Sequence, residues 1–332
     1  MNFIDDGDKY EKLNTIKKKP LIISNNFKAQ INFQEHVDVK QNEINDILPL
    51  EFDWRKKIQS KIYNQENCGN CWALSTISAI NDHYQIKFGK NIEFSWKQAM
   101  NCYENNPCMG GNPAKFLKHL ESSNLVENTC NNVKGCNCEN LGYLKTITLK
   151  NTKLYRDIKT IKHHLTKQGP LIAGMLVYEN FKSGKFGTHG IYLDNVLSYD
   201  DRLKPIFGHP EHFQGCHSIV VVGYGETPHV ETSPSKYENV QYWICRNSWG
   251  EKWGENGYFK IATHKFNKLV QLEKEYDFKN GTFGGMLAFD VTTDSHSKFF
   301  FPYSLPISIG IVTLLVVIVI FYQYKKSKTF YV

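Results

Sequence analysis

Apolar residues recur at helical spacing in the segment that begins at Cys71. Intervals of three or four residues place side chains on one face of a helix. The residues concerned are Ala73, Ile77, Ile80 and Tyr84. The residues before Cys71 lack this pattern and include Gly69, so an irregular loop is expected there. We therefore predict an amphipathic helix from about Cys71 onward, with Cys71 in its first turn.

The same pattern predicts helices in the first half of the chain and strands in the second. A short helix is expected over 94–102, and another from Asp157 to the stop signal Gly169-Pro170. Buried strands follow, and longer loops connect them. The predicted strands are Leu171–Tyr178, His217–Tyr224, Gln241–Arg246 and Tyr258–Ala262, and the predicted loops are 193–214 and 226–239. Histidines 163, 164, 189, 209 and 212 match no motif and are predicted to lie at the surface or in loops. The 332 residues are too many for one ordinary core and suit a two-lobed domain with additions at each end.

A different pattern appears near the C-terminus. Residues 305–322 form an apolar run of 18 residues without a charge. A helix of that length spans about 27 Å, enough for the core of a bilayer. Aromatic residues flank the run, and the tail 323–332 is basic, as is typical of membrane anchors. We predict a single transmembrane helix, with a buried core helix as the weaker alternative and the side of the membrane left open.

Cys71 is a candidate nucleophile because of its predicted position. The free N–H groups and positive dipole at a helix start favour the thiolate. Cys68 and Cys71 also form a C-x-x-C pair, which is typical of zinc half-sites and redox motifs. A structural zinc site needs a second pair at matching spacing, and Cys136-Asn137-Cys138 fits poorly.

Three motifs in order resemble the papain-like cysteine proteases. They are Gln65-Glu66-Asn67-Cys68-Gly69-Asn70-Cys71-Trp72, Gly215-Cys216-His217-Ser218 with the apolar run after it, and Asn247-Ser248-Trp249-Gly250. His217 follows Cys71 by 146 residues, within the interval of about 130 to 150 typical of such enzymes. The resemblance implies an α+β, papain-like fold with a helical lobe and a β-barrel-like lobe, over a domain of about 48–295.

The resemblance also implies roles for individual residues. Cys71 would be the nucleophile, His217 its base and Asn247 the group that orients the imidazole. A cysteine paired with a protonated histidine is expected to be a thiolate at neutral pH. Gln65 and the backbone N–H of Cys71 would bind the oxyanion. The remaining expected site residues are Gly69, Gly111 and Trp249, with Gly111 beside the substrate main chain and Trp249 shielding the bond between His217 and Asn247.

The sequence departs from the family pattern at Asn70, Cys216 and Ser218, where Ser, a polar residue or Gly, and Ala are usual. None of these changes removes a catalytic atom. A catalytically silent, membrane-tethered peptide-binding relative is the main alternative, and it would be expected to lack one of the four key residues. All four are present. A metal or disulfide protein built on Cys68 and Cys71 would leave His217 and Asn247 unexplained.

Nine cysteines raise the question of disulfides. The resemblance suggests a Cys68–Cys108 bridge and a further pairing within the group from Cys102 to Cys138. Residues 1–47 lack a cleavable signal peptide and resemble the short propeptide of cathepsin B around Asn25–Phe33. The paired histidines of the cathepsin B occluding loop are absent from 130–138, so endopeptidase activity without carboxydipeptidase activity is expected.

Charge and composition narrow the partners. The chain has 332 residues, 41% of them hydrophobic, and a formal charge of +7 that comes mostly from scattered lysines. Scattered charge is typical of a solvated surface, so we predict no nucleic-acid partner. The expected partners are polypeptide substrates and a membrane, with no metal or organic cofactor. The oligomeric state stays open.

Overall fold

The computed structural model describes residues 47–103, 106–123, 125–127, 146–193, 196–208, 213–263 and 285–292. Its α-helices are α2 Cys71–Phe88, α3 Trp96–Tyr103, α4 Pro113–Leu120 and α5 Ile158–Lys167. Its longer strands are β3 Thr146–Tyr155, β4 Leu171–Tyr178, β8 Phe213–Ser233, β9 Lys236–Arg246, β10 Tyr258–Ala262 and β11 Met286–Thr292. The predicted arm and transmembrane segment lie outside the described residues.

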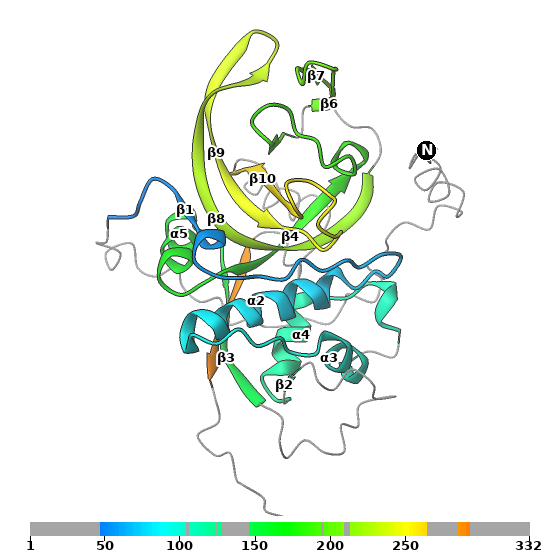
Figure 1. The fold of residues 1–332 in the computed structure, drawn as a ribbon, viewed down its shortest axis with the longest axis vertical. Helices are drawn as coiled ribbons and strands as arrows, with labels where there is room; N and C mark the ends of the chain where they lie inside the picture. The colour runs from blue at the N-terminus through cyan, green and yellow to red at the C-terminus, as the bar shows by residue number, and fades with distance from the viewer. Residues whose placement is uncertain are drawn as a thin grey trace, which may run out of the picture. The chain divides into compact units, whose positions relative to one another are not determined.

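Helix α2 is the central helix of the structure, and it begins at Cys71 as predicted. It contacts β8 and β11 as well as the helices α3 and α4 (Figure 1). Because neighbours cover several of its faces, even polar residues such as Thr76 and Ser78 are buried. The prediction of an amphipathic helix with one apolar face therefore understates how much of α2 is buried. The helix ends at Gly89, whose φ of 66° is the left-handed conformation that glycine adopts without strain.

One large sheet contains most of the strands in the described residues. Its strand order is β2-β3-β11-β4-β8-β9-β10-β5, where β2 is Leu125–Val126 and β5 is Ile191–Tyr192, and β1 Phe52–Asp53 pairs with β8. The pairs β4·β8 and β8·β9 are antiparallel. The predicted strands Leu171–Tyr178 and Tyr258–Ala262 are confirmed at both ends.

Two hydrophobic clusters lie on opposite faces of β8. Val220 and Val222 belong to the cluster that contains residues of α2 and α4. Ile219 and Val221 belong to the cluster formed largely by the strands around β9 and β10. Alternate residues of a strand point to opposite faces, so β8 separates a helical core from a β-rich core. This confirms the predicted α+β class with two cores.

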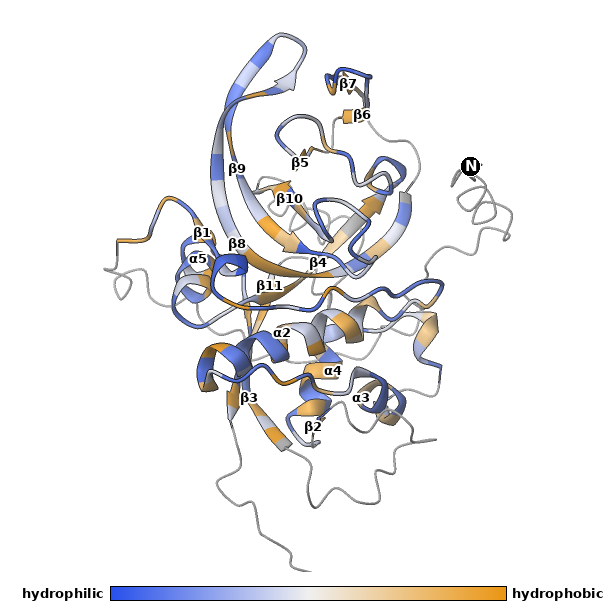
Figure 2. Ribbon diagram, viewed as in Figure 1, coloured by the Kyte–Doolittle hydropathy of each residue, from blue (hydrophilic) through white to orange (hydrophobic). Residues whose placement is uncertain are grey.

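The two predicted long loops are wrong in part. Residues 226–239 form the outer half of the β8–β9 hairpin, with Thr227 opposite Val240 and Val230 opposite Glu238. Pro228 falls where the register shifts between Thr227 and Val230, and a bulge is a position where a strand tolerates proline. This outer half is largely hydrophilic, so the apolar pattern used to predict strands is absent from it (Figure 2). Residues 196–207 form a second hairpin, β6 Val196–Tyr199 with β7 Pro205–Phe207.

Other differences concern single elements. Helix α4 and the strands β3 and β11 have no counterpart in the prediction. His164, predicted to lie at the surface, is 3% exposed because α5 packs it against Tyr155 and His83. Among the described residues, no helix is both long enough and apolar enough to cross a bilayer.

Candidate active site

The thiol of Cys71 lies at the start of α2 and against β8. Asn70 occupies the N-cap position but makes no capping hydrogen bond through its side chain. The Asn70 side chain therefore satisfies none of the backbone N–H groups at the helix start, although the Asn70 carbonyl accepts from Ala73 N–H at 3.0 Å. Backbone hydrogen bonds to the sulfur come from Ser218 of β8 and from Cys71 and Trp72 themselves. The nucleophile position predicted from sequence is thus surrounded by backbone donors.

His217 and Asn247 lie together, as predicted. His217 Nε2 is 2.7 Å from Asn247 Oδ1, although His217 comes from β8 and Asn247 directly follows β9. The backbone N–H of Ser248 donates to the same Oδ1 at 2.7 Å, which fixes the orientation of the amide. An amide oxygen only accepts, so Nε2 must carry the proton and Nδ1 is left as an acceptor. In this tautomer Nδ1 is free of a proton and can accept one, as a general base must.

Trp249 covers this pair from one side. Its ring centroid lies 5.0 Å from that of His217, and Phe181 and Trp253 pack edge-on against the indole at 5.4 and 5.2 Å. His217 is 6% exposed and Asn247 is 3% exposed. The predicted shielding position of Trp249 agrees with these contacts.

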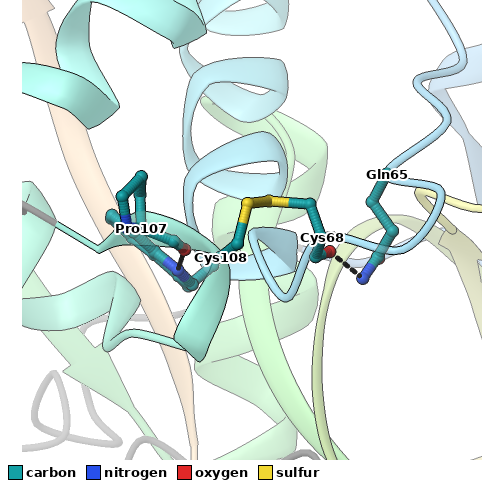
Figure 3. Close-up of a disulfide and its surroundings, with 5 residues drawn as sticks. Gln65, Cys68, Pro107 and Cys108 are labelled. Atoms are coloured by element: carbon teal, nitrogen blue, oxygen red, sulfur yellow. Dashed lines mark hydrogen bonds between the residues drawn. A yellow bond between two sulfur atoms is a disulfide. The ribbon is translucent and has the colours of Figure 1, made fainter. Parts of the chain in front are cut away.

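Gln65 is held by residues next to Asn247. Ser248 Oγ donates to Gln65 Oε1 at 2.6 Å, and the backbone N–H of Gln65 donates to the carbonyl of Ser248 at 2.8 Å. Gln65 Nε2 donates to the carbonyl of Cys68 at 3.0 Å (Figure 3). The amide nitrogen carries two protons, so one donor is left for an oxyanion. Ser248 therefore links the predicted oxyanion donor to the orienting asparagine, a link that the motif contained but that sequence reasoning did not assign.

A disulfide joins Cys68 to Cys108, which confirms the predicted bridge (Figure 3). Cys68 is consequently not available as a metal ligand or as a redox partner of Cys71. Among the described residues, no group of three or more His, Cys, Asp or Glu side chains is placed to hold a metal ion. The other predicted pairings involve cysteines between 130 and 138, outside the described residues.

The two predicted substrate-binding glycines lie near this disulfide. The backbone N–H of Gly69 donates to the carbonyl of Cys108 at 2.9 Å, and a Cβ at Gly69 would come within 2.6 Å of that oxygen. A Cβ at Gly111 would lie 2.4 Å from the indole of Trp72. Close packing alone thus requires glycine at both positions, and their contact with substrate stays a prediction.

Burial changes the electrostatics that the sequence suggested. Burial of the thiol raises the pKa of Cys71 to about 11, against the backbone hydrogen bonds that lower it. Burial of the imidazole lowers the pKa of His217 to about 4, against the bond to Asn247 that raises it. Both directions favour a neutral thiol beside a neutral imidazole. The predicted lowering of the Cys71 pKa is therefore wrong for this structure, because desolvation outweighs the helix start.

Two further contacts join α2 to the strands that carry the histidine and the asparagine. Ser75 Oγ of α2 lies 2.7 Å from Ser218 Oγ of β8, and both are buried. Asp82 of α2 forms an ion pair with Arg246 of β9, the residue before Asn247. Sequence analysis noted Ser218 as a departure from the pattern but assigned none of these contacts, because partners 143 and 164 residues apart leave no local signal.

Comparison with known proteins agrees with this geometry. The profile of the family described as papain family cysteine protease matches residues 48–278, which is more than half of the chain. The chain belongs to this family. Membership accounts for the α+β fold and for the spacing of the three motifs.

Two viral proteins are among the similar curated proteins. Probable cysteine proteinase 224L of Invertebrate iridescent virus 6 is 30% identical over 289 residues, which cover 68% of this chain and 64% of that protein. Probable cysteine proteinase 024R of Invertebrate iridescent virus 3 is 30% identical over 318 residues, covering 74% of this chain and 64% of that protein. The chain thus spans a little under two thirds of the length of these relatives.

Solved structures show the same fold at lower identity. ProCathepsin B S9 from Trypanosoma congolense matches with a TM-score of 0.57 at 21% identity, covering 78% of this chain and 82% of that one. The bromelain protease from Ananas comosus, solved in complex with the E64 inhibitor, matches with a TM-score of 0.50 at 20% identity, covering 74% of this chain and all of that one. At such identity, the likeness supports the papain-like fold alone.

Proposed function

We propose that this chain is a cysteine endopeptidase that cleaves polypeptides through Cys71, His217 and Asn247. The observation that carries the proposal is the 2.7 Å contact between His217 Nε2 and Asn247 Oδ1, which leaves Nδ1 as a proton acceptor. Membership of a protease family supports it. The position of Cys71 supports it as well. Cys71 lies at a helix start, and its sulfur accepts a backbone hydrogen bond from Ser218, the residue after His217 on β8.

The mechanism follows from the neutral pair that burial favours. As the Cys71 sulfur attacks the peptide carbonyl, its proton passes to Nδ1 of His217. The side-chain amide of Gln65 and the backbone N–H of Cys71 then stabilise the oxyanion. The imidazolium returns the proton to the leaving amine, and water hydrolyses the thioester with His217 again as base. Asn247 holds the ring throughout, and Trp249 keeps water from that bond.

The decisive experiment combines labelling with mutation. E64 should modify the full-length protein on Cys71, as mapped by mass spectrometry of the labelled peptide. Cys71→Ala should abolish both labelling and hydrolysis of a protein substrate, whereas Cys245→Ala, which removes another buried thiol, should keep both. Full hydrolysis by the Cys71 variant would disprove the mechanism. A folded wild-type protein that neither reacts with E64 nor cleaves any substrate would instead favour the catalytically silent, peptide-binding relative.

We also infer that the protease acts from a membrane. The support is the apolar run 305–322, its aromatic flanks and the basic tail 323–332. Lys325, Lys326 and Lys328 after the run favour a cytosolic tail, and the disulfide is compatible with a lumenal or exterior catalytic domain. Protease protection in sealed vesicles decides the side: a protected catalytic domain supports the lumenal arrangement, and digestion refutes it.

Substrate cleavage should be internal. The N-terminal arm resembles the short propeptide of cathepsin B, but residues 130–138 contain no histidine pair that would bind a substrate C-terminus. We therefore propose a cathepsin B-like arm on an endopeptidase. Release of dipeptides from a free C-terminus, followed by mass spectrometry, would contradict this.

A further inference from the structure

We propose that Cys216 is a resolving thiol for Cys71: when peroxide oxidises Cys71, Cys216 closes a disulfide with it and switches the protease off reversibly. The site is a pair of thiols at the contact between α2 and β8. The proposal rests on the proposed function only in that Cys71 is the nucleophile, and the disulfide itself can be detected without any activity.

The face of β8 that carries Cys216 is turned toward α2. Cys216 and Ser218 are alternate residues of β8, so their side chains share one face. Ser218 on this face meets Ser75 of α2 at 2.7 Å, and the next alternate residues, Val220 and Val222, belong to the core cluster of α2. Ile219 lies on the other face and joins the β-rich core, while His217 contacts Asn247 and Trp249.

The spacings along the two elements match. Cys71 lies one turn before Ser75, so both point to the same side of α2, about 6 Å apart along the axis. Cys216 lies two residues before Ser218, about 6.6 Å away along the strand. The Cys71 sulfur also accepts a backbone hydrogen bond from Ser218, which places it at this end of the contact. Cys71 therefore faces Cys216 in the same way that Ser75 faces Ser218, about 6 Å further along the contact between α2 and β8.

The two thiols also interact electrostatically. Burial raises the pKa of the Cys216 thiol to about 12, and its interaction with Cys71 adds to the rise. Cys216 is less buried than Cys71 or Cys245, so a small oxidant can reach the pair from its side. Cys245 lies opposite Val221 in the β-rich core, and Cys68 is already bonded to Cys108.

The chemistry balances with hydrogen peroxide as the oxidant. The Cys71 thiol and one peroxide give Cys71 sulfenic acid and one water. The Cys216 sulfur then attacks the sulfenic sulfur, an S–S bond forms, and the hydroxyl leaves with the Cys216 proton as a second water. A dithiol such as dithiothreitol reverses the step and is itself oxidised. Without Cys216, further peroxide takes Cys71 to sulfinic acid, which thiols do not reduce.

The test uses the full-length protein, a small excess of hydrogen peroxide and three variants. We expect the wild-type protein to lose hydrolytic activity, to yield a peptide pair linked through Cys71 and Cys216, and to recover most activity in dithiothreitol. Cys216→Ser should be active when reduced and lose activity in peroxide, but form no linked pair, accumulate sulfinic Cys71 and recover little. Cys245→Ala should behave as wild type.

The outcomes separate this proposal from the proposed function. Equal recovery of wild type and Cys216→Ser without a linked pair would overturn the resolving role, and so would a link from Cys71 to another cysteine. Hydrolysis by Cys71→Ala would overturn the proposed nucleophile, while a Cys71–Cys216 link in the wild type would still establish the thiol pair.

Discussion

Asp82 of α2 and Arg246 of β9 form an ion pair with Oδ2 and Nη2 2.6 Å apart, and each side chain is 2% exposed. A second contact joins Asp82 Oδ1 to Nη1 at 3.3 Å, and Ser60 Oγ also donates to this carboxylate. Arg246 directly precedes Asn247, and α2 begins at Cys71. The pair therefore ties the helix that carries the proposed nucleophile, Cys71, to the strand that directly precedes Asn247.

Removing one member of this pair should destabilise the protein strongly. Asp82→Ala leaves the Arg246 guanidinium buried without its carboxylate, and such changes typically cost about 3–5 kcal/mol. Lys118→Ala, which breaks an exposed pair with Glu121, should cost at most about 1 kcal/mol. Chemical unfolding of both variants measures the difference. Equal free energies of unfolding for the two variants would mean that the buried ion pair stabilises the protein no more than the exposed one.

Asn247→Ala should lower kcat much more than it changes KM. Its side chain contacts His217, the proposed base, so its loss is expected to act on the transition state and not on substrate binding. Steady-state kinetics with a fluorogenic peptide give both constants. Asn91→Ala, at an exposed position, is the control and should match wild type. A rise in KM alone would assign Asn247 to substrate binding.

Gln65→Ala should lower kcat by about 10² to 10³, the usual effect of losing one oxyanion donor. Ser248 and Cys68 hold the amide in place before substrate arrives, so no reorganisation is needed in the transition state. The exposed Gln59 provides a control, Gln59→Ala, whose rate should be unchanged. A wild-type rate for Gln65→Ala would remove it from the catalytic machinery.

Buried histidines should make the fold sensitive to acid. Burial lowers the pKa of His164 well below its ordinary value and also lowers that of His83. As the pH falls below about 6.5, the unfolded chain gains protons that the folded chain excludes, so the free energy of unfolding falls. Neither ring nitrogen of His164 has a hydrogen-bond partner among the described residues.

His164→Phe should therefore flatten this pH dependence at little cost at pH 7. The loss of stability between about pH 6.5 and 5 should shrink by up to about 1.4 kcal/mol per pH unit. Urea unfolding at several pH values measures the slope, with the exposed His189→Gln as the control. A slope identical to that of wild type would show that His164 is protonated equally in both states.

The proposed membrane anchor has a direct biochemical test. Alkaline carbonate should leave the full-length protein in the membrane fraction, because about 18 apolar residues remain inserted without electrostatic help. A chain that ends at residue 295 should be recovered in the soluble fraction. Release of the full-length protein by carbonate would show that 305–322 is not a membrane span.

The sequence by itself determined the parts of this protein that depend on local pattern. The start of α2 at Cys71, the bounds of β4 and β10 and the three motifs follow from periodicity and residue type, and the structure agrees with them. The polar hairpin of 226–239 was not predicted. Alternating apolar residues indicate a strand only when one face of that strand is buried. The burial of His164 was not predicted, because it depends on contacts with Tyr155 of β3 and His83 of α2, which lie outside α5.

Only the tertiary structure decided the electrostatics and the long-range contacts of the site. Burial reversed the expected direction of the Cys71 pKa, because a helix start lowers it modestly and desolvation raises it more. The Asp82–Arg246 and Ser75–Ser218 contacts bring together residues more than a hundred positions apart. Residue type and spacing identify which groups can react, whereas desolvation and distance depend on which elements pack together, and packing is a property of the folded chain.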